Sequence, residues 1–175
     1  MNLGKRIMVM GFSGSGKSTL ARQLGAFCGL PVVHSDMLFW KPGWVESARD
    51  AYVEKMRTAA DQPAWVIDGD GKRTRDCTLQ RADTVIYIDM NRCTRLYRAI
   101  KRRFRYHGRT RPDMTEGCPE KLDWLYIKGV WSDARRSRKS DLAWIAGIRP
   151  PEKVYQLKGI RAVKRFLRRL AEEAA

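Results

Sequence analysis

The sequence predicts an α/β protein in which five parallel strands form one doubly wound sheet. Apolar, strand-like runs alternate with helix-like stretches along the 175 residues. A glycine-rich turn joins the first of these runs to the first helix. Two later runs end in an acidic residue, at the sheet edge where functional side chains gather in open α/β folds. Right-handed crossovers would then place helices on both faces of the sheet.

The elements follow in order along the chain, and no internal repeat or interdomain linker interrupts them. Residues 1–175 are therefore expected to form a single domain. The expected strands are residues 6–10, 31–34, 64–68, 84–89 and 153–157. The expected helices begin near residue 19 and at residues 47, 93, 120 and 160, and the last four end near residues 60, 105, 146 and 174.

The glycine-rich turn is the most informative stretch of the sequence. Residues 11–18, GFSGSGKS, fit the phosphate-binding pattern G-x-x-x-x-G-K-[ST] at every fixed position. Glycines let backbone N–H groups approach phosphate oxygens, and the helix that follows directs its positive end toward the anion. Lys17 is expected to reach the β- and γ-phosphates of ATP, and Ser18 to ligate Mg²⁺. The expected nucleotide-binding residues are Gly11, Ser13, Gly14, Ser15, Gly16, Lys17, Ser18 and Thr19.

Two acids end expected strands. Asp36 follows the second strand and could orient an acceptor, hold a metal-bound water or act as a base, whereas the alternative is a turn or helix-capping residue. Asp68 ends the third strand and is the candidate acid that holds Mg²⁺ through water. His34 is expected to be structural rather than catalytic.

An aromatic stretch, residues 37–45, follows the second strand, and its Pro42-Gly43 predicts a turn. Trp40 and Trp44 could wall an acceptor pocket, although a hydrophobic cluster explains them equally well. Gly69, in the turn after Asp68, and Arg73, a clamp for an acceptor anion, are also expected to bind the acceptor.

Charge is concentrated in the second half of the chain. The net charge is +16, and residues 91–175 hold 23 Lys/Arg against 9 Asp/Glu. Residues 92–111 contain nine cations and no acid, so we expect an anion to join them. The segment 106–120 contains Gly and Pro residues and carries Arg109 and Arg111 near its start. It has the composition and length of a functional lid.

These stretches together resemble small phosphate-loop kinases of the adenylate kinase type, and most closely the bacterial DNA topology modulation proteins, which are related to adenylate kinase. The resemblance covers nearly the whole chain and includes HSD at 34–36, FWKPGW at 39–44, IDG at 67–69 and GRTRPD at 108–113 leading to GCPEK at 117–121. It implies a core, a small acceptor-binding insertion over about residues 37–63 and an arginine-bearing lid. Arg103, Arg109, Arg135 and Arg138 match the lid-flanking arginines of the family loosely, and Arg103 and Arg135 are expected to bind the nucleotide. Asp70 departs from the family, where Asn is usual, which puts the acceptor in doubt.

The leading hypothesis is an ATP- and Mg²⁺-dependent phosphotransferase that acts on a nucleoside monophosphate, with Lys17, Asp36, Arg109 and Arg138 as catalytic residues. A kinase of a small hydroxyl acceptor would use Asp36 as its base. A further alternative is an ATP-binding regulator that binds DNA through the basic C-terminal half, including the last helix. A GTPase is disfavoured because no guanine-reading Asn-Lys-x-Asp occurs.

Some classes of protein are disfavoured by the sequence. The four cysteines show no C-x-x-C spacing, so a zinc site or a disulfide framework is not expected. No apolar run approaches the length of a membrane span, and no signal peptide is evident. A cytoplasmic protein without a membrane partner is expected.

Overall fold

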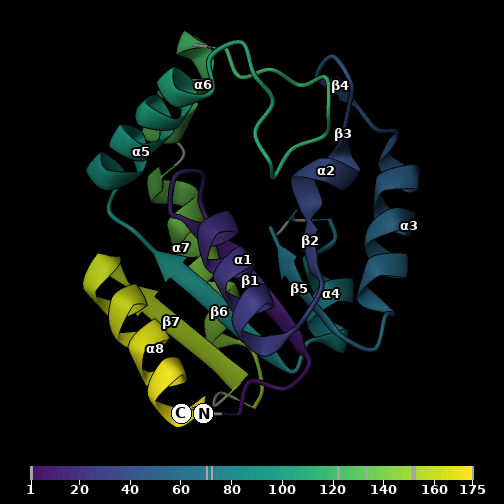
Figure 1. Ribbon diagram of the computed structural model, residues 1–175, viewed down its shortest axis with the longest axis vertical. Helices are drawn as coiled ribbons and strands as arrows, with labels where there is room; N and C mark the ends of the chain where they lie inside the picture. The colour runs from purple at the N-terminus through teal and green to yellow at the C-terminus, as the bar shows by residue number, and fades with distance from the viewer. Residues whose placement is uncertain are drawn as a thin grey trace.

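The computed structural model describes residues 2–69, 71, 73–121, 123–132, 134–150 and 153–174. Its centre is a five-stranded sheet with the order β2-β5-β1-β6-β7 (Figure 1). The strands are β1 (Arg6–Gly11), β2 (Val32–His34), β5 (Trp65–Asp68), β6 (Thr84–Asp89) and β7 (Val154–Lys158). Every neighbouring pair is parallel. The predicted fold class is thereby confirmed.

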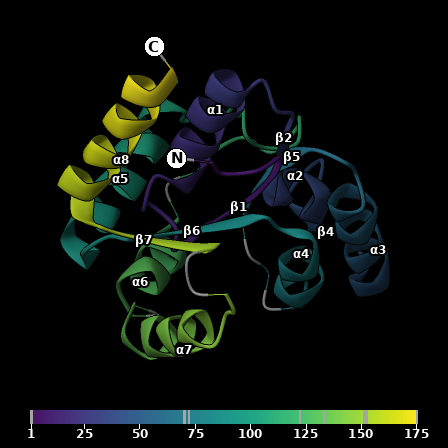
Figure 2. The same ribbon diagram turned by 90° about the horizontal axis from the view of Figure 1, so that it is seen from below.

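Helices cover both faces of this sheet (Figure 2). On one face lie α1 (Lys17–Cys28) and α8 (Gly159–Ala174), whose Leu20, Leu24 and Phe166 are buried against the strands. On the other lie α3 (Arg49–Ala60), α4 (Arg75–Arg81) and α7 (Ala134–Ala146), with Met56 and Ile145 in the second core. Each buried side chain of this size stabilises the fold by roughly 1.5–3 kcal/mol. The sheet is therefore a rigid base for the loops at the carboxyl ends of its strands.

The register of the sheet brings the ends of three strands together. His34 of β2 lies opposite Asp68 of β5, and Asp68 lies opposite Val9 of β1. The glycine-rich turn leaves β1 two residues after Val9, so the turn, Asp68 and the residues after His34 share one edge of the sheet. This is the edge at which parallel α/β sheets bind ligands.

Several elements differ from the sequence-based expectation. The aromatic stretch forms a short helix, α2 (Ser35–Phe39), and a hairpin of β3 (Trp40–Lys41) and β4 (Val45–Glu46). The helix α4 was not expected, because its seven residues are too few to show helical periodicity. The expected helical stretch over residues 120–146 begins only at Trp124: the structure describes α6 (Trp124–Ser132) and α7, and residue 133 lies outside the described residues. The helix α5 (Arg92–Arg105) packs beside α6 (Figure 1) and is capped by Asn91, whose Oδ1 accepts from Thr94 N at 2.9 Å.

The lid segment, residues 106–120, is attached to the hairpin and to α2. The Gly43 N–H donates to the Gly117 carbonyl at 2.8 Å, and the Thr115 hydroxyl donates to the Trp40 carbonyl at 2.7 Å. The Cys118 thiol lies 3.1 Å from the Lys41 carbonyl. Within the segment Arg111, Asp113, Met114, Cys118 and Glu120 are buried. In this structure, therefore, the lid segment and the insertion form one connected layer above the sheet edge.

None of the described helices combines the length and apolarity that crossing a membrane would need.

Candidate active site

The glycine-rich turn follows a path that only glycine allows at two positions. Gly14 and Gly16 have φ of +77° and +99°, and a Cβ on Gly14 would lie 2.3 Å from the Arg95 carbonyl oxygen. The turn is fastened to α5, because Arg95 Nε donates to the Ser13 carbonyl at 3.0 Å and Arg98 Nη1 to the Ser15 carbonyl at 2.9 Å. Two carbonyls of the turn are thus directed toward α5.

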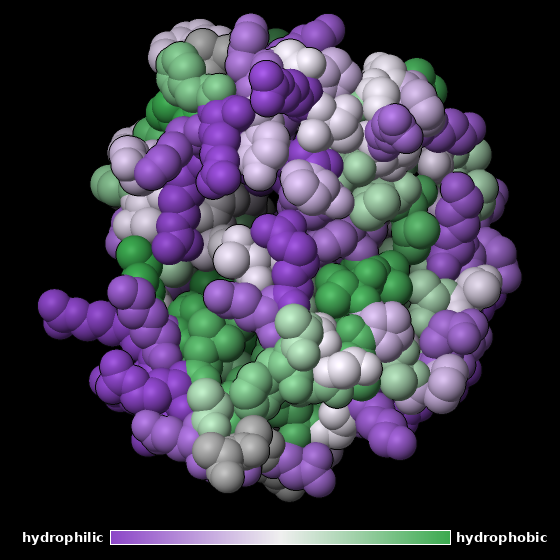
Figure 3. Space-filling model, in the orientation of Figure 1, coloured by the Kyte–Doolittle hydropathy of each residue, from purple (hydrophilic) through white to green (hydrophobic). Residues whose placement is uncertain are grey.

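A cavity of about 560 Å³ opens beside this turn. We call it the loop cavity. Six of the residues expected to bind nucleotide line it, and cations from α5 and α8 join them. Its lining includes Gly14, Ser15, Gly16, Lys17, Ser18, Thr19, Arg98, Lys101, Arg102, Arg105, Asp113 and Lys164. Ile160, Val163 and Leu167 of α8 form an apolar wall. Figure 3 shows this face with hydrophilic residues over α5 and α8 and a hydrophobic strip between α8 and α1.

Three of the expected nucleotide-binding residues, Gly11, Ser13 and Arg103, do not line this cavity. Gly11 ends β1, and the Ser13 hydroxyl is hydrogen-bonded to the hydroxyl of Tyr126 on α6. In contrast, Lys164 of α8 lines the cavity, although it was not among the expected nucleotide-binding residues. The loop cavity thus combines an apolar wall with cations, as a nucleotide base and its phosphates would require.

A second cavity, of about 380 Å³, lies on the other side of Lys17. We call it the Asp36 cavity. It brings together Asp36, Gly69 and Arg73, three of the residues expected to bind the acceptor. Its remaining lining residues are Lys17, Ser35, Phe39, Tyr52 and Gly71. Gly69 has a φ of +108°, and a Cβ there would lie 1.9 Å from Ser35 Oγ.

Trp40 and Trp44 do not line either cavity. Their rings pack edge to face with centroids 5.4 Å apart, and Trp44 Nε1 donates to the Pro119 carbonyl at 2.9 Å. They form the hydrophobic cluster that was the alternative interpretation, and they hold the lid segment. The aromatic residues that do line the Asp36 cavity, Phe39 and Tyr52, come from α2 and α3.

Lys17 is the residue that the two cavities share. Its Nζ lies 4.0 Å from Asp68 Oδ1, and Asp68 Oδ2 is 2.7 Å from His34 Nδ1. Burial alone would raise the pKa of Asp68, but Lys17 and hydrogen bonds from His34 and Ser18 offset this and hold the pKa below its ordinary value. Asp68 is therefore an anion at neutral pH, and His34 supports it structurally.

The oxygens beside Lys17 fit Mg²⁺. Burial would raise the pKa of Asp113, but Arg111, its own backbone N–H, Ser18 and Arg22 together hold it below its ordinary value. Ser18 and Asp113 line the loop cavity together, and Lys17 lies between that cavity and Asp68, so a hydroxyl and two carboxylates lie near Lys17. Mg²⁺ prefers oxygen ligands and is usually held by one or two carboxylates together with substrate phosphates and water. Among the described residues no group of three or more His, Cys, Asp or Glu side chains could hold a metal. One hydroxyl and two carboxylates would suit Mg²⁺ together with the phosphates of a bound nucleotide.

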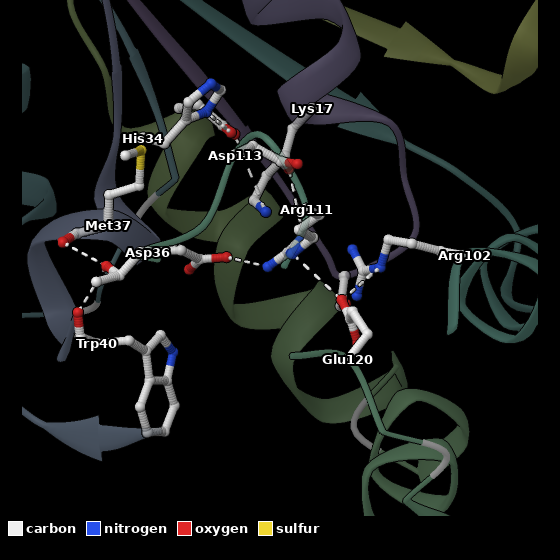
Figure 4. A network of polar contacts seen from close by, with 12 residues as sticks. Lys17, His34, Asp36, Met37, Trp40, Arg102, Arg111, Asp113 and Glu120 are labelled. Carbon is white, nitrogen blue, oxygen red and sulfur yellow. Dashed lines mark hydrogen bonds and ion pairs between the residues drawn. The ribbon is translucent and has the colours of Figure 1, made fainter. Parts of the chain in front are cut away.

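Arg111, in the lid segment, contacts one acid from each cavity: Asp113 of the loop cavity and Asp36 of the Asp36 cavity (Figure 4). Its side chain is only 5% exposed. Nη2 donates to Asp36 Oδ2 at 3.0 Å, Nη1 lies 3.3 Å from Asp113 Oδ2, and Nε lies 3.2 Å from Glu120 Oε1. Burial would lower the pKa of Arg111, but the three carboxylates, led by Asp113, raise it above its ordinary value.

The cations of residues 92–111 have counterions after all. Glu120 is fully buried, and its carboxylate lies 3.4 Å from Arg102 Nε and 3.5 Å from Arg103 Nη1 in addition to its contact with Arg111. An anion does join this run in the structure, and it is a carboxylate of the chain itself. The acids lie just beyond the run in sequence, and the fold of the lid segment brings them back to it.

The predicted lid-flanking arginines lie in different environments. Arg109 is exposed and lines neither cavity. Arg103 packs over the Tyr126 ring at 3.8 Å and donates to the Lys121 carbonyl. Arg138 forms a two-point ion pair with Asp89 at 2.6 and 2.9 Å. The side chain of Arg135 lies outside the described residues, as does Asp70.

Sequence reasoning missed Arg102, Asp113 and Lys164 as cavity residues, and it missed the central position of Arg111. The RPD sequence at 111–113 was the available signal, because its arginine and acid flank a proline that keeps the chain out of a helix. Nothing in the sequence indicated that these side chains would face Ser18 and Asp36.

No protein-family model and no curated protein sequence matches this chain. Solved structures do match it over almost their full length. A gluconokinase from Sinorhizobium meliloti 1021 superposes with a TM-score of 0.56 at 16% identity, covering 99% of this chain and 97% of its own. A shikimate kinase from Acinetobacter baumannii, solved with shikimate, gives 0.60 at 14% identity, covering 98% and 93%. A shikimate kinase from Aquifex aeolicus gives 0.53 at 20% identity, covering 97% and 98%. The chain thus has the fold of small phosphate-loop kinases.

Proposed function

We propose that this chain is a kinase that transfers the γ-phosphoryl group of ATP to a hydroxyl group of a small acceptor bound beside Asp36. One observation carries the proposal: Lys17 lines both cavities, so a γ-phosphate and an acceptor oxygen can meet at one cation. Phosphoryl transfer depends mainly on such positioning and on charge neutralisation. The fold, which gluconokinase and shikimate kinase share, supports the same reaction class.

The residues suggest how the transfer proceeds. The acceptor oxygen forms a bond to the γ-phosphorus while the bond from that phosphorus to the oxygen shared with the β-phosphate breaks, and ADP leaves with the electron pair. Asp36 is placed to take the hydroxyl proton, and Arg111 orients its carboxylate at 3.0 Å. Lys17 stabilises the charge that develops between the two ligands. Mg²⁺, held by Ser18 and Asp68, would neutralise the β- and γ-phosphates.

Two features of the Asp36 cavity favour a hydroxyl acceptor that carries an anionic group. Arg73 is exposed at the cavity and suits a carboxylate or a phosphate. Asp36 suits a hydroxyl acceptor, because a hydroxyl must lose its proton as it attacks and a base can take that proton. A phosphate oxygen is already ionised and needs no base. The nucleoside monophosphate implied by the family resemblance is the second candidate, and Arg73 is the residue that favours it.

An acceptor screen tests the proposal. ADP formation from Mg-ATP would be measured with hydroxy acids, sugar acids, nucleosides and nucleoside monophosphates, with Lys17→Ala as the background. We expect a hydroxyl compound to stimulate ADP formation, and Asp36→Asn to lower kcat about 10²–10⁴-fold. Asp50→Asn, the same change at an exposed position of α3, should leave kcat unchanged. Stimulation by a monophosphate that Asp36→Asn does not impair would instead support the second candidate.

Binding of DNA remains a separate proposal, supported by the exposed cations of α8. Arg161, Arg165, Arg168 and Arg169 are exposed and do not line the loop cavity. If no acceptor stimulates ADP formation, DNA affinity would be measured across a salt series. Contact of these cations with phosphates would make log Kd rise linearly with log salt. Replacing all four by Gln should flatten that slope, and an unchanged slope would refute this role for α8.

A further inference from the structure

Asp113 is the one acid among the described residues that line the loop cavity, where the other charged side chains are all cations. It belongs to the lid segment, far in sequence from the phosphate loop, yet it lines the loop cavity together with Ser18. It is largely buried, so its position is built into the fold. In Figure 4 its carboxylate lies between Arg111 and the region of Lys17.

Two cations hold the Asp113 carboxylate without neutralising it fully. Oδ2 lies 3.3 Å from Arg111 Nη1, and Oδ1 lies 3.6 Å from Arg22 Nη1 on α1. Arg111 divides its charge among Asp36, Asp113 and Glu120. Arg22 is about half exposed, which screens its contribution.

A carboxylate at this position would repel the phosphates of a bound nucleotide. At 4–6 Å, two unit charges repel by about 3–4 kcal/mol at an effective dielectric constant of 20. The repulsion becomes attraction if a divalent cation lies between the carboxylate and the phosphates. Ser18 is the residue at which the phosphate-loop pattern places that cation, and it lines the loop cavity together with Asp113. Its neighbour in sequence, Lys17, has its Nζ 4.0 Å from Asp68 Oδ1.

We propose that Asp113 contributes a second carboxylate to the Mg²⁺ site, so that the metal joins the lid segment to the phosphate loop. The proposal rests on the nucleotide-binding part of the proposed function and is independent of the acceptor. Because Arg111 contacts both Asp113 and Asp36, it acts as a positioning residue between the metal and the Asp36 cavity. Metal binding would then also fix the carboxylate that faces the acceptor.

Calorimetric titration with ADP, with and without Mg²⁺, tests this without any turnover. The wild-type chain is expected to bind Mg-ADP more tightly than ADP in EDTA. In Asp113→Asn the ratio of the affinity for Mg-ADP to the affinity for metal-free ADP should fall by about tenfold or more, as expected when a group that supports a metal is lost. The affinity for metal-free ADP should stay the same or rise, because a repelling charge is gone. Glu116→Gln removes the same charge from an exposed position of the lid segment and should change neither value.

Trypsin gives a second measurement. Arg109 is exposed, whereas the bond after Arg111 precedes proline and resists cleavage. Mg-ADP should slow cleavage after Arg109 in the wild-type chain more than metal-free ADP does, and Asp113→Asn should abolish that difference. If Asp113→Asn fails to fold, Asp113→Glu keeps the charge and is expected to retain the gain from Mg²⁺.

The outcomes separate the two proposals. Equal weakening of ADP and Mg-ADP binding in Asp113→Asn would mean that Asp113 only pairs with Arg111 and Arg22, which overturns the metal assignment and leaves the kinase proposal standing. Asp113→Glu keeps the carboxylate but lengthens the side chain. If this variant, like Asp113→Asn, no longer binds Mg-ADP more tightly than metal-free ADP, that result would also count against Asp113 as a metal ligand. A wild-type chain that binds no ADP would overturn both proposals.

Discussion

The buried acid at the end of the lid segment is the most consequential charge to remove. Glu120 is fully buried, and its carboxylate faces Arg102, Arg103 and Arg111 at 3.2–3.5 Å. In Glu120→Gln the shape of the side chain is kept, but three guanidinium groups lose a shared counterion. Two of those groups are themselves at least nine-tenths buried. The variant therefore isolates the electrostatic contribution of this acid.

The structure allows a rough magnitude. Removing one partner of a buried ion pair costs about 3–5 kcal/mol, because the remaining charge is left uncompensated. Arg111 keeps Asp36 and Asp113, and Arg102 is a quarter exposed, so we expect the lower end of this range, about 3 kcal/mol. For a domain of this size that corresponds to a fall in Tm of roughly 6–12 °C.

Urea unfolding, followed by circular dichroism, would measure the free energy of unfolding, and calorimetry the Tm. Glu116→Gln, in the same segment but exposed, is the matched control and should change stability by less than about 0.5 kcal/mol. A loss below about 1 kcal/mol for Glu120→Gln would refute the reasoning, since it would mean that water already compensates these arginines.

Two further predictions concern the ends of β1. Gly14→Ala would place a Cβ 2.3 Å from the Arg95 carbonyl at a φ of +77°, so we expect ADP affinity, measured by calorimetry, to fall at least about tenfold while the folded sheet persists. At the other end, burial would raise the pKa of Asp83, but hydrogen bonds from Arg6 and from the backbone of Lys5 lower it below its ordinary value. The contribution of Asp83 to stability is therefore present above its unfolded-state pKa of about 4 and is lost as the pH falls through the lower folded-state pKa. Urea unfolding between pH 6 and 3 would measure this loss. The free energy of unfolding of Asp83→Asn should depend less steeply on pH than that of the wild-type chain.

The sheet and the phosphate loop could be predicted because their signals are local. The five expected strands agree with the observed ones to within a residue or two, since buried parallel strands appear as continuous apolar runs. Asp36 and Gly69 reach one cavity, as expected, because both follow parallel strands that end at the same sheet edge.

The layer above the sheet could not be predicted in the same way. Its order comes from pairings between distant residues, such as Arg111 with Asp36 and Trp44 with the Pro119 carbonyl, which leave no periodic trace in the sequence. Composition indicated nine cations without an acid, but it could not indicate that Glu120 folds back among them. Likewise, Trp40 and Trp44 have the composition of a pocket wall, and only the hairpin shows that they support the lid segment instead.

The way in which the lid segment is attached has a consequence for how such a protein can diverge. Most of its ties to the insertion end on main-chain atoms: the carbonyls of Trp40 and Lys41 and the N–H of Gly43. Main-chain atoms are present whatever side chain a position carries. Point substitutions in the insertion can therefore reshape what is recognised there while the segment above keeps its anchorage. A library that randomises Phe39 and Tyr52, the residues of the insertion that line the Asp36 cavity, and leaves Asp36, Trp44 and the lid segment intact, is the natural starting point for changing which molecule this scaffold accepts.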